Sequence, residues 1–447
     1  MPKKKNLLLF VVTCVVVFGA LATASPASAA SEKVLYSFCS ANNCVDGASP
    51  AAGVIFDSAG HLYGTTQGGG TNMFCGGPPP VGCGNVFELL PSNGKWTEKV
   101  LYSFCPSDNC PDGVNPNGLV FDNAGNLYGT TTNGEAPGST GSVFELVHSN
   151  SKWTEKVVHD FKPYVGDGTL PYGSLIFDAA GNAYGTTYAG GTESSCGSGG
   201  CGTVFELVRS NGKWTEKVLH SFNLDSGGYY PSPGLVLDKA GNLYGATILG
   251  GDLHSCSGVG CGVVFELINK NGAWAEKVLH TFQQNGKDGI SPQSGVIFDE
   301  AGNLYGTTGA GGSADCGGLG CGTVFELTRS NGKWTEKILH SFHKNGQDGT
   351  DPQAQLVFDK AGNIYGTTFF GGAYGYYGIV FELSLKNGKW TEKVLHSFNP
   401  NGHDGNFPTN SPLVLDKAGN LYGTTYWGGN TNCGNPNGCG MVFEITP

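Results

Sequence analysis

Six aspartates recur in one short motif, Asp-Gly-x-x-Pro. They are Asp46, Asp112, Asp167, Asp288, Asp348 and Asp404, and Gly227 stands at the corresponding place in the one remaining copy. If the loops that carry them converge, their carboxylate oxygens suit a hard cation such as Ca²⁺. The structural alternative is that Asp-Gly makes a tight turn before a proline. Both interpretations stay open at the level of sequence, and no cofactor is established by it.

The cysteines form the second chemical pattern. When Cys14 is set aside, fourteen remain as seven neighbouring couples: Cys39/Cys44, Cys75/Cys83, Cys105/Cys110, Cys196/Cys201, Cys256/Cys261, Cys316/Cys321 and Cys433/Cys439. A zinc site would need four of them to converge, and redox sites usually read Cys-x-x-Cys. We therefore predict structural disulfides, with local pairing as the simplest connectivity, each contributing roughly 2 kcal/mol in the chain-entropy model.

Aromatic residues that interrupt the regular pattern are the third candidate. They are Phe369, Phe370, Tyr374, Tyr376, Tyr377, Tyr426 and Trp427, in segments where other copies of the pattern carry cysteines. Rings beside glycines and asparagines suit stacking on a sugar or on a partner chain. Alternatively, these rings fill the space that a disulfide occupies elsewhere.

Motifs of catalysis are missing from the sequence. It contains no Gly-x-Ser-x-Gly and no His-Glu-x-x-His. A lyase or hydrolase acting on polysaccharide would have to use unique acids such as Glu135, Glu193 or Asp315. Four histidines share one place in the pattern with two tyrosines, and we interpret that position as packing: His220, His280, His340, His396, Tyr36 and Tyr102.

The elements that must position these residues follow from a seven-fold repeat. The string Asp-x-Ala-Gly-Asn-Leu-Tyr-Gly-Thr-Thr recurs with its first residue at Asp57, Asp122, Asp178, Asp238, Asp299, Asp359 and Asp416, at spacings of 56 to 65 residues. Each copy holds four strand-like runs, as at 295–298, 303–308, 323–327 and 333–342. Four antiparallel strands per repeat predict an all-β, seven-bladed propeller over residues 31–447.

The two ends of the chain predict how the ring closes. Residues 32–38 read as a fourth, outer strand, whereas the last repeat stops after its third strand at 441–445. Pairing these segments completes the last blade and removes an exposed edge. With strands A to D counted outward, the long and variable D–A and B–C loops share one face, which we call the loop face. Variable loops on a rigid scaffold carry function, and we expect the aspartates around the channel mouth there.

Residues 1–30 have the form of a secretory signal peptide, with Lys3-Lys4-Lys5 before an apolar stretch and Ala27-Ser28-Ala29 at its end. An uncleaved anchor is the alternative. Removal of the three lysines takes the formal net charge from −11 to −14, which argues against nucleic acid as a partner. No second segment is apolar enough to span a membrane, so we expect a secreted monomer at the cell surface, in the periplasm or outside the cell.

The recurring strings Gly-Thr-Val-Phe-Glu-Leu, Trp-Thr-Glu-Lys-Val-Leu-His-Ser-Phe and Asp-Gly-x-x-Pro resemble the GloVer tandem repeat over residues 32–446. That resemblance implies export from a bacterium and implies no activity. Many members carry a variable C-terminal surface anchor, whereas this sequence ends at Thr446-Pro447. The sequence therefore favours a non-catalytic binding propeller for a glycan or a cell-surface partner, with a polysaccharide-acting enzyme and a structural envelope protein as alternatives.

Overall fold

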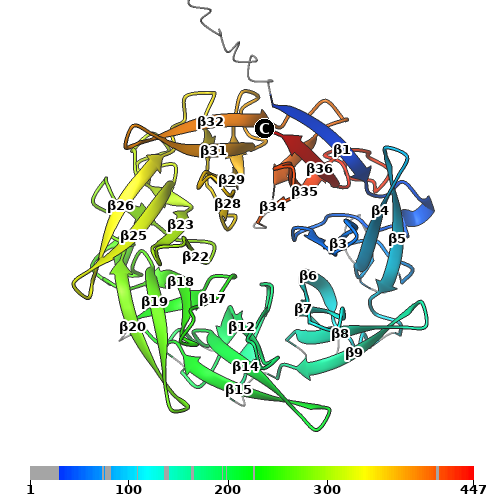
Figure 1. Ribbon diagram of the computed structural model, residues 1–447, viewed down its shortest axis with the longest axis horizontal. Helices are drawn as coiled ribbons and strands as arrows, with labels where there is room; N and C mark the ends of the chain where they lie inside the picture. The colour runs from blue at the N-terminus through cyan, green and yellow to red at the C-terminus, as the bar shows by residue number, and fades with distance from the viewer. Residues whose placement is uncertain are drawn as a thin grey trace, which may run out of the picture.

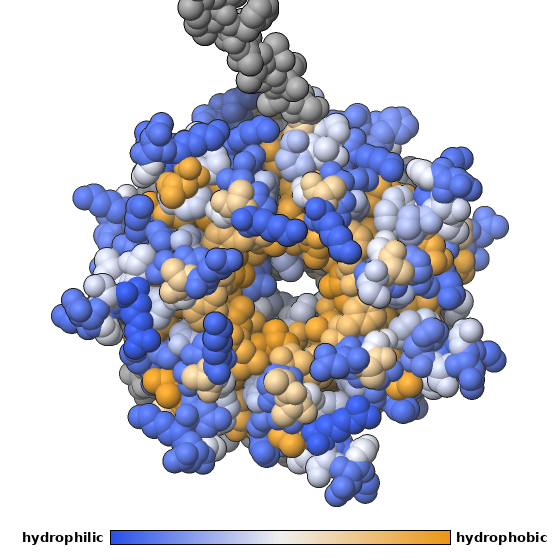
Figure 2. Space-filling model, viewed as in Figure 1, coloured by the Kyte–Doolittle hydropathy of each residue, from blue (hydrophilic) through white to orange (hydrophobic). Residues whose placement is uncertain are grey.

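Seven small antiparallel sheets are arranged as blades around a central axis in the computed structural model (Figure 1). The structure describes residues 30–72, 75, 82–107, 109–134, 140–162, 166–193, 195–197, 199–224, 227–408 and 412–447. The signal peptide predicted at 1–30 lies almost entirely outside this range. The fold is the predicted seven-bladed β-propeller, with hydrophobic residues around the central opening and hydrophilic residues along the outer rim (Figure 2).

Each blade contains strands A to D, from the axis outward. Blade 1 has β2 (Ile55–Phe56), β3 (Leu62–Thr66), β4 (Asn85–Ser92) and β5 (Lys95–Ser103). Blade 2 has β6 (Val114–Phe121), β7 (Leu127–Asn133), β8 (Ser142–Ser149) and β9 (Lys152–Asp160). Blade 3 has β11 (Ile176–Phe177), β12 (Ala183–Thr187), β14 (Thr203–Ser210) and β15 (Lys213–Ser221). Blade 4 has β16 (Gly228–Pro231), β17 (Val236–Leu237), β18 (Leu243–Gly250), β19 (Val263–Lys270) and β20 (Ala273–Thr281).

The remaining three blades follow the same order. Blade 5 has β22 (Ile297–Phe298), β23 (Leu304–Thr308), β25 (Thr323–Ser330) and β26 (Lys333–Ser341). Blade 6 has β28 (Val357–Phe358), β29 (Ile364–Thr368), β31 (Ile379–Lys386) and β32 (Lys389–Ser397). Blade 7 has β33 (Gly405–Pro408), β34 (Val414–Leu415), β35 (Leu421–Gly428), β36 (Met441–Thr446) and β1 (Ser31–Ser37). Three short strand pairs extend blades 3, 5 and 6: β10 (Gly168–Thr169) with β13 (Ala189–Gly190), β21 (Gly289–Ile290) with β24 (Ala310–Gly311), and β27 (Gly349–Thr350) with β30 (Phe370–Gly371). The chain also forms the 3₁₀ turns η1 (Asn42–Cys44) and η2 (Cys256–Gly258).

Ring closure is confirmed. Strand β1 pairs antiparallel with β36, with Ser31 opposite Thr446 and Ser37 opposite Met441. The first and last strands of the chain therefore share one blade (Figure 1). Because the outer strand of blade 7 comes from the opposite end of the chain, opening the ring would expose the edge of β36.

Strand A is shorter than the sequence predicts. The run 295–298 contributes only Ile297–Phe298 to the ladder, and a separate short pair forms nearer the loop face at Gly289–Ile290. The break falls at Ser291, whose φ is 55°, and at Pro292, which has no N–H for the ladder. In blade 2 the two parts merge into β6, with a register shift between Pro116 and Leu119.

The hydrophobic core lies between blades and not within them. One cluster, for example, joins Val264 and Phe282 of blade 4 to Leu304 and Phe325 of blade 5, all fully buried. The Phe282 and Phe325 rings meet edge to face at 5.2 Å between centroids. Within blade 5 the Phe325 ring also lies against Gly306 of the neighbouring strand, where a Cβ atom would come within 2.6 Å of the ring.

We predict that Gly306→Ala destabilises the protein by about 1–3 kcal/mol, because overpacking displaces the buried Phe325 ring. Gly306 has an ordinary backbone conformation, so the cost arises from packing alone. Gly199→Ala is the matched control, since a Cβ atom at Gly199 would have no other described atom within 4 Å. Denaturant unfolding of both variants measures the difference, and equal losses would contradict this account of the core.

Candidate functional site

Seven residues on the loop face adopt a left-handed backbone conformation immediately before the proline of the D–A loop. This pre-proline ring consists of Ser49, Asn115, Leu170, Tyr230, Ser291, Asp351 and Phe407, with φ between 54° and 58°. Non-glycine residues seldom adopt positive φ, and such strain concentrates at functional sites. The backbone of the ring is the same in every blade, whereas its side chains differ in size, charge and polarity.

A backbone hydrogen bond holds each member of the ring to the preceding blade. The N–H of Ser291 donates to the carbonyl of Cys261 at 2.8 Å, and that of Asp351 donates to Cys321 at 2.9 Å. In five blades the acceptor is the second cysteine of a B–C loop disulfide: Cys83, Cys201, Cys261, Cys321 and Cys439. The disulfides thus restrain the carbonyls on which the ring depends.

The axial end of the loop face contains a hollow of about 380 Å³. Its polar lining includes the amides of Gln67, Asn117 and Gln355 and the phenol of Tyr172, together with small residues from several inner strands. No carboxylate of the described residues lines it. The expectation of an aspartate ring at the channel mouth is therefore not met.

The six motif aspartates lie instead at the outer strands, where each closes its own D–A loop. Asp348 accepts hydrogen bonds from the backbone N–H groups of His343 and Gly349 at 3.0 and 2.8 Å, and it contacts Nε2 of His340 at 3.2 Å. Asp46 accepts the hydroxyl of Tyr36 at 2.7 Å and the N–H of Ser40 at 2.8 Å. The outer-strand histidine or tyrosine is therefore a partner of the aspartate, not only a packing residue.

The aromatic residues predicted for blades 6 and 7 do come together, around a ring that the sequence analysis missed. Phe407 of the pre-proline ring lies 5.0 Å from Phe369, 5.7 Å from Phe370 and 5.1 Å from Trp427, between ring centroids. Tyr426 adjoins Trp427 at 5.7 Å. Phe407 escaped notice because it lies inside the Asp-Gly-x-x-Pro motif, where the variable positions look like turn residues.

Tyr377 stands where five of the other B–C loops carry their second cysteine. Its carbonyl accepts the N–H of Phe407 at 3.0 Å, the bond that a cysteine carbonyl accepts in five other blades. The ring is half-buried and lies 6.1 Å from Phe407. Part of the cluster therefore fills space left by a missing disulfide, which was one of the two interpretations.

Tyr374 and Tyr376 are different, because their side chains are 57% and 60% exposed. Tyr376 borders a hollow of about 470 Å³ between blades 5 and 6, which Phe370, Thr350 and Lys344 also line. The Lys344 ammonium lies 5.8 Å from the centre of the Tyr376 ring, within the range of a cation–π contact. Tyr374 does not line this hollow.

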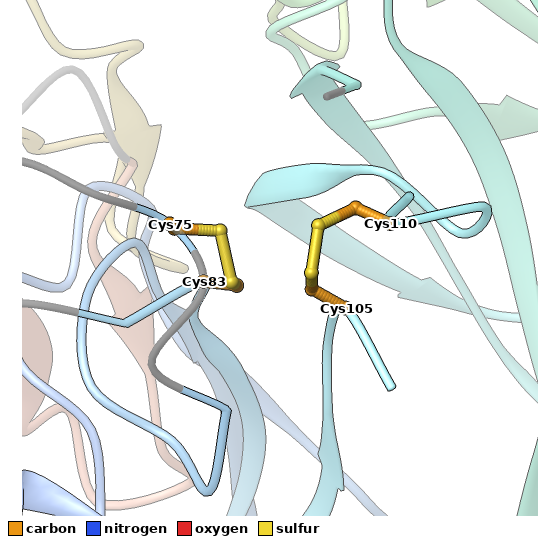
Figure 3. A group of neighbouring side chains, drawn as sticks. All are labelled: Cys75, Cys83, Cys105 and Cys110. Carbon is orange, nitrogen blue, oxygen red and sulfur yellow. A yellow bond between two sulfur atoms is a disulfide. The ribbon is translucent and has the colours of Figure 1, made fainter. Parts of the chain in front are cut away.

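All fourteen cysteines of the seven couples form the local disulfides. At the junction of blades 1 and 2, the Cys75–Cys83 and Cys105–Cys110 bonds lie opposite one another (Figure 3), with one sulfur from each residue within 4.8 Å of the others. Four cysteines thus converge there as a zinc site would require, but as two disulfides they offer no thiolate.

The two described acids proposed for an enzyme, Glu193 and Asp315, do not form a carboxylate pair. Glu193 and Asp315 are exposed and belong to loops of blades 3 and 5, with blade 4 between them. Asp315 accepts a hydrogen bond from Ser313 and contacts Nδ1 of His343 at 2.7 Å. Glu135 lies outside the described residues.

Seven glutamates at the junctions between blades were missed by the sequence analysis. They are Glu32, Glu98, Glu155, Glu216, Glu276, Glu336 and Glu392, one in each outer strand. In all seven, Oε1 is buried without a hydrogen-bond partner among the described residues. Burial, with the charge of Asp46 beside it, raises the pKa of Glu98 to about 8. The sequence signal that could have revealed them is that every repeat carries this glutamate, in a strand whose opposite face is exposed to solvent.

The fold and the loop face define a seven-bladed propeller with short-range disulfides and blade-specific loops. The chain belongs to the Gloeobacter/Verrucomicrobia repeat family, whose model matches residues 19–197 and 314–447. No curated protein matches the sequence. Among the described residues, no helix is long and apolar enough to cross a membrane.

Solved structures resemble this chain at low sequence identity. The extracellular domain of the one-component system BT4673 from B. thetaiotaomicron is 12% identical over 89% of this chain, with a TM-score of 0.52. This chain spans only 39% of that protein. An α-L-arabinanase from Penicillium chrysogenum is 14% identical, with 77% of this chain and 96% of that chain covered and a TM-score of 0.46. At 12% identity, the similarity to the BT4673 domain shows the fold alone.

The buried glutamates predict how stability depends on pH, and Glu98 gives the sharpest case. Its pKa in the folded state lies above the value in the unfolded state, so the folded protein loses stability when Glu98 ionises. This loss is absent below about pH 4.5 and complete above about pH 8. Glu98→Gln should therefore gain stability relative to the wild type as pH rises from 4 to 9. Melting temperatures measured in chelator across this range test it, and parallel pH profiles would contradict it.

Proposed function

We propose that this protein is an exported binding propeller that holds a glycan on its loop face, over blades 5 and 6. The observation that carries the proposal is the exposed Tyr376 ring at the border of a hollow lined by Phe370, Lys344 and Thr350. Ligand sites combine apolar walls with a few polar groups that fix orientation. An exposed aromatic ring beside a cation and a hydroxyl offers that combination to a sugar ring with its hydroxyl groups.

The rest of the loop face supports the same function. At the hollow, the Cys316–Cys321 disulfide holds the loop of blade 5 and the backbone bond from Phe407 to Tyr377 holds the loop of blade 6. A ligand would therefore meet a surface that costs little entropy to bind. Export is supported by the seven disulfides, which persist in oxidising compartments. A cell-surface protein is the other partner class that exposed tyrosines would suit.

We predict that Tyr376→Ala weakens glycan binding by at least about tenfold, equivalent to about 1.4 kcal/mol. Tyr374→Ala is the matched control, because Tyr374 is similarly exposed but does not line the hollow. A glycan array followed by calorimetry on both variants measures the effect.

Two outcomes would reject the proposal. One is the absence of binding to any glycan on the array by the wild-type protein. The other is an equal loss of affinity in the Tyr374→Ala and Tyr376→Ala variants, since that would place the ligand outside the hollow.

A further inference from the structure

Four of the seven blade junctions bring together one imidazole and two carboxylates. They are His159/Asp167/Glu216, His280/Asp288/Glu336, His340/Asp348/Glu392 and His396/Asp404/Glu32. In each junction one ligand atom from every residue lies within 4.8 Å of the others. The histidine comes from the outer strand of one blade, the aspartate from the D–A loop that follows, and the glutamate from the outer strand of the next blade, as with β26 and β32 (Figure 1).

Two of the three donors, the imidazole and the aspartate, are spaced as neighbouring ligands of one ion would be, and the glutamate oxygen lies within 4.8 Å of them. In the junction of blades 4 and 5, Nε2 of His280 lies 3.3 Å from Oδ2 of Asp288, and Oε1 of Glu336 is buried with no hydrogen-bond partner among the described residues. For bonds of about 2.0–2.2 Å to a tetrahedral ion, neighbouring ligand atoms lie roughly 3.3–3.6 Å apart. The imidazole–carboxylate spacing of this junction fits that range.

The surroundings of the aspartate also fit. Backbone N–H groups of Gln283 and Gly289 donate to Asp288 at 3.1 and 2.7 Å, and such outer contacts orient metal-binding carboxylates. The side chain of His280 is 20% exposed and that of Asp288 10%. The cluster is therefore largely, but not completely, shielded from solvent.

We propose that each of these four junctions binds one divalent transition-metal ion of the Zn²⁺ class, through His Nε2 and one oxygen from each carboxylate. Three protein ligands leave one tetrahedral position for water. Imidazole suits Zn²⁺ and is a poor ligand for Ca²⁺, which takes oxygen donors. The ion would join two consecutive blades and give the buried glutamate oxygen a partner.

The other three junctions are natural controls within the same chain. Tyr36 and Tyr102 replace the histidine in two of them and donate to Asp46 and Asp112, both at 2.7 Å. A neutral phenol that donates its proton leaves no third ligand. In the junction of blades 3 and 4 the aspartate is replaced by Gly227. The Glu276 carboxylate occupies the space of the missing side chain, because a Cβ atom at Gly227 would come within 2.5 Å of it.

The test counts ions bound to the folded, disulfide-bonded protein. After chelation and titration with Zn²⁺ in metal-buffered solution, calorimetry and elemental analysis should give four ions per chain. His280→Tyr should give three, and His159→Tyr/His280→Tyr/His340→Tyr/His396→Tyr none above the level of surface histidines. The chain itself shows that tyrosine is accommodated at this position, so these variants should fold, which circular dichroism checks.

A gain-of-site variant completes the design. Tyr102→His restores the missing donor beside Asp112 and Glu155, so the count should rise to five. The proposal is overturned if the wild type retains no Zn²⁺, if the quadruple variant binds as many ions as the wild type, or if Tyr102→His stays at four. These readouts do not depend on any glycan, so the two proposals succeed or fail separately.

Discussion

The propeller depends on one backbone hydrogen bond, repeated at every junction between blades. The left-handed residue before the D–A proline donates its N–H to a carbonyl at the end of the preceding B–C loop, at 2.7 to 3.2 Å. The glycine that follows the acceptor packs on that proline, and a Cβ atom at Gly322 would come within 2.4 Å of Pro352. Neither partner can move without disturbing the neighbouring blade.

Since this contact uses only backbone atoms, it leaves the side chain of the left-handed residue free to vary. The same scaffold therefore presents a serine at 291, a carboxylate at 351 and a phenyl ring at 407. Around Asp351 the amides of Gln293 and Gln353 approach to 3.3 and 2.7 Å, and burial raises the pKa of Asp351 to about 6. At the pre-proline position, diversity thus comes from the side chain, while the backbone conformation stays constant.

The repeat made the architecture predictable, because strand order, hairpin turns and ring closure each leave a local pattern in the sequence. The disulfide pairing was predictable for the same reason, since the couples are near neighbours. The junctions were not predictable, because their three donors come from two blades and a loop. His340 and Glu392 are 52 positions apart in the chain, and only the curvature of the ring brings them together. Sequence reasoning consequently treated the histidines as isolated packing residues a blade apart.

The placement of the motif aspartates connects these observations. An aspartate at the channel mouth would have served a ligand on the axis, as the sequence suggested. At the outer strand the aspartate accepts hydrogen bonds from the backbone of its own D–A loop. These bonds fix the loop, and the pre-proline residue in that loop donates its N–H to the preceding blade. The same carboxylate lies beside a glutamate from the next blade. One aspartate therefore takes part both in the conformation of the loop and in the contact between blades. Stability at the rim and side-chain display on the loop face are therefore two consequences of a single loop conformation.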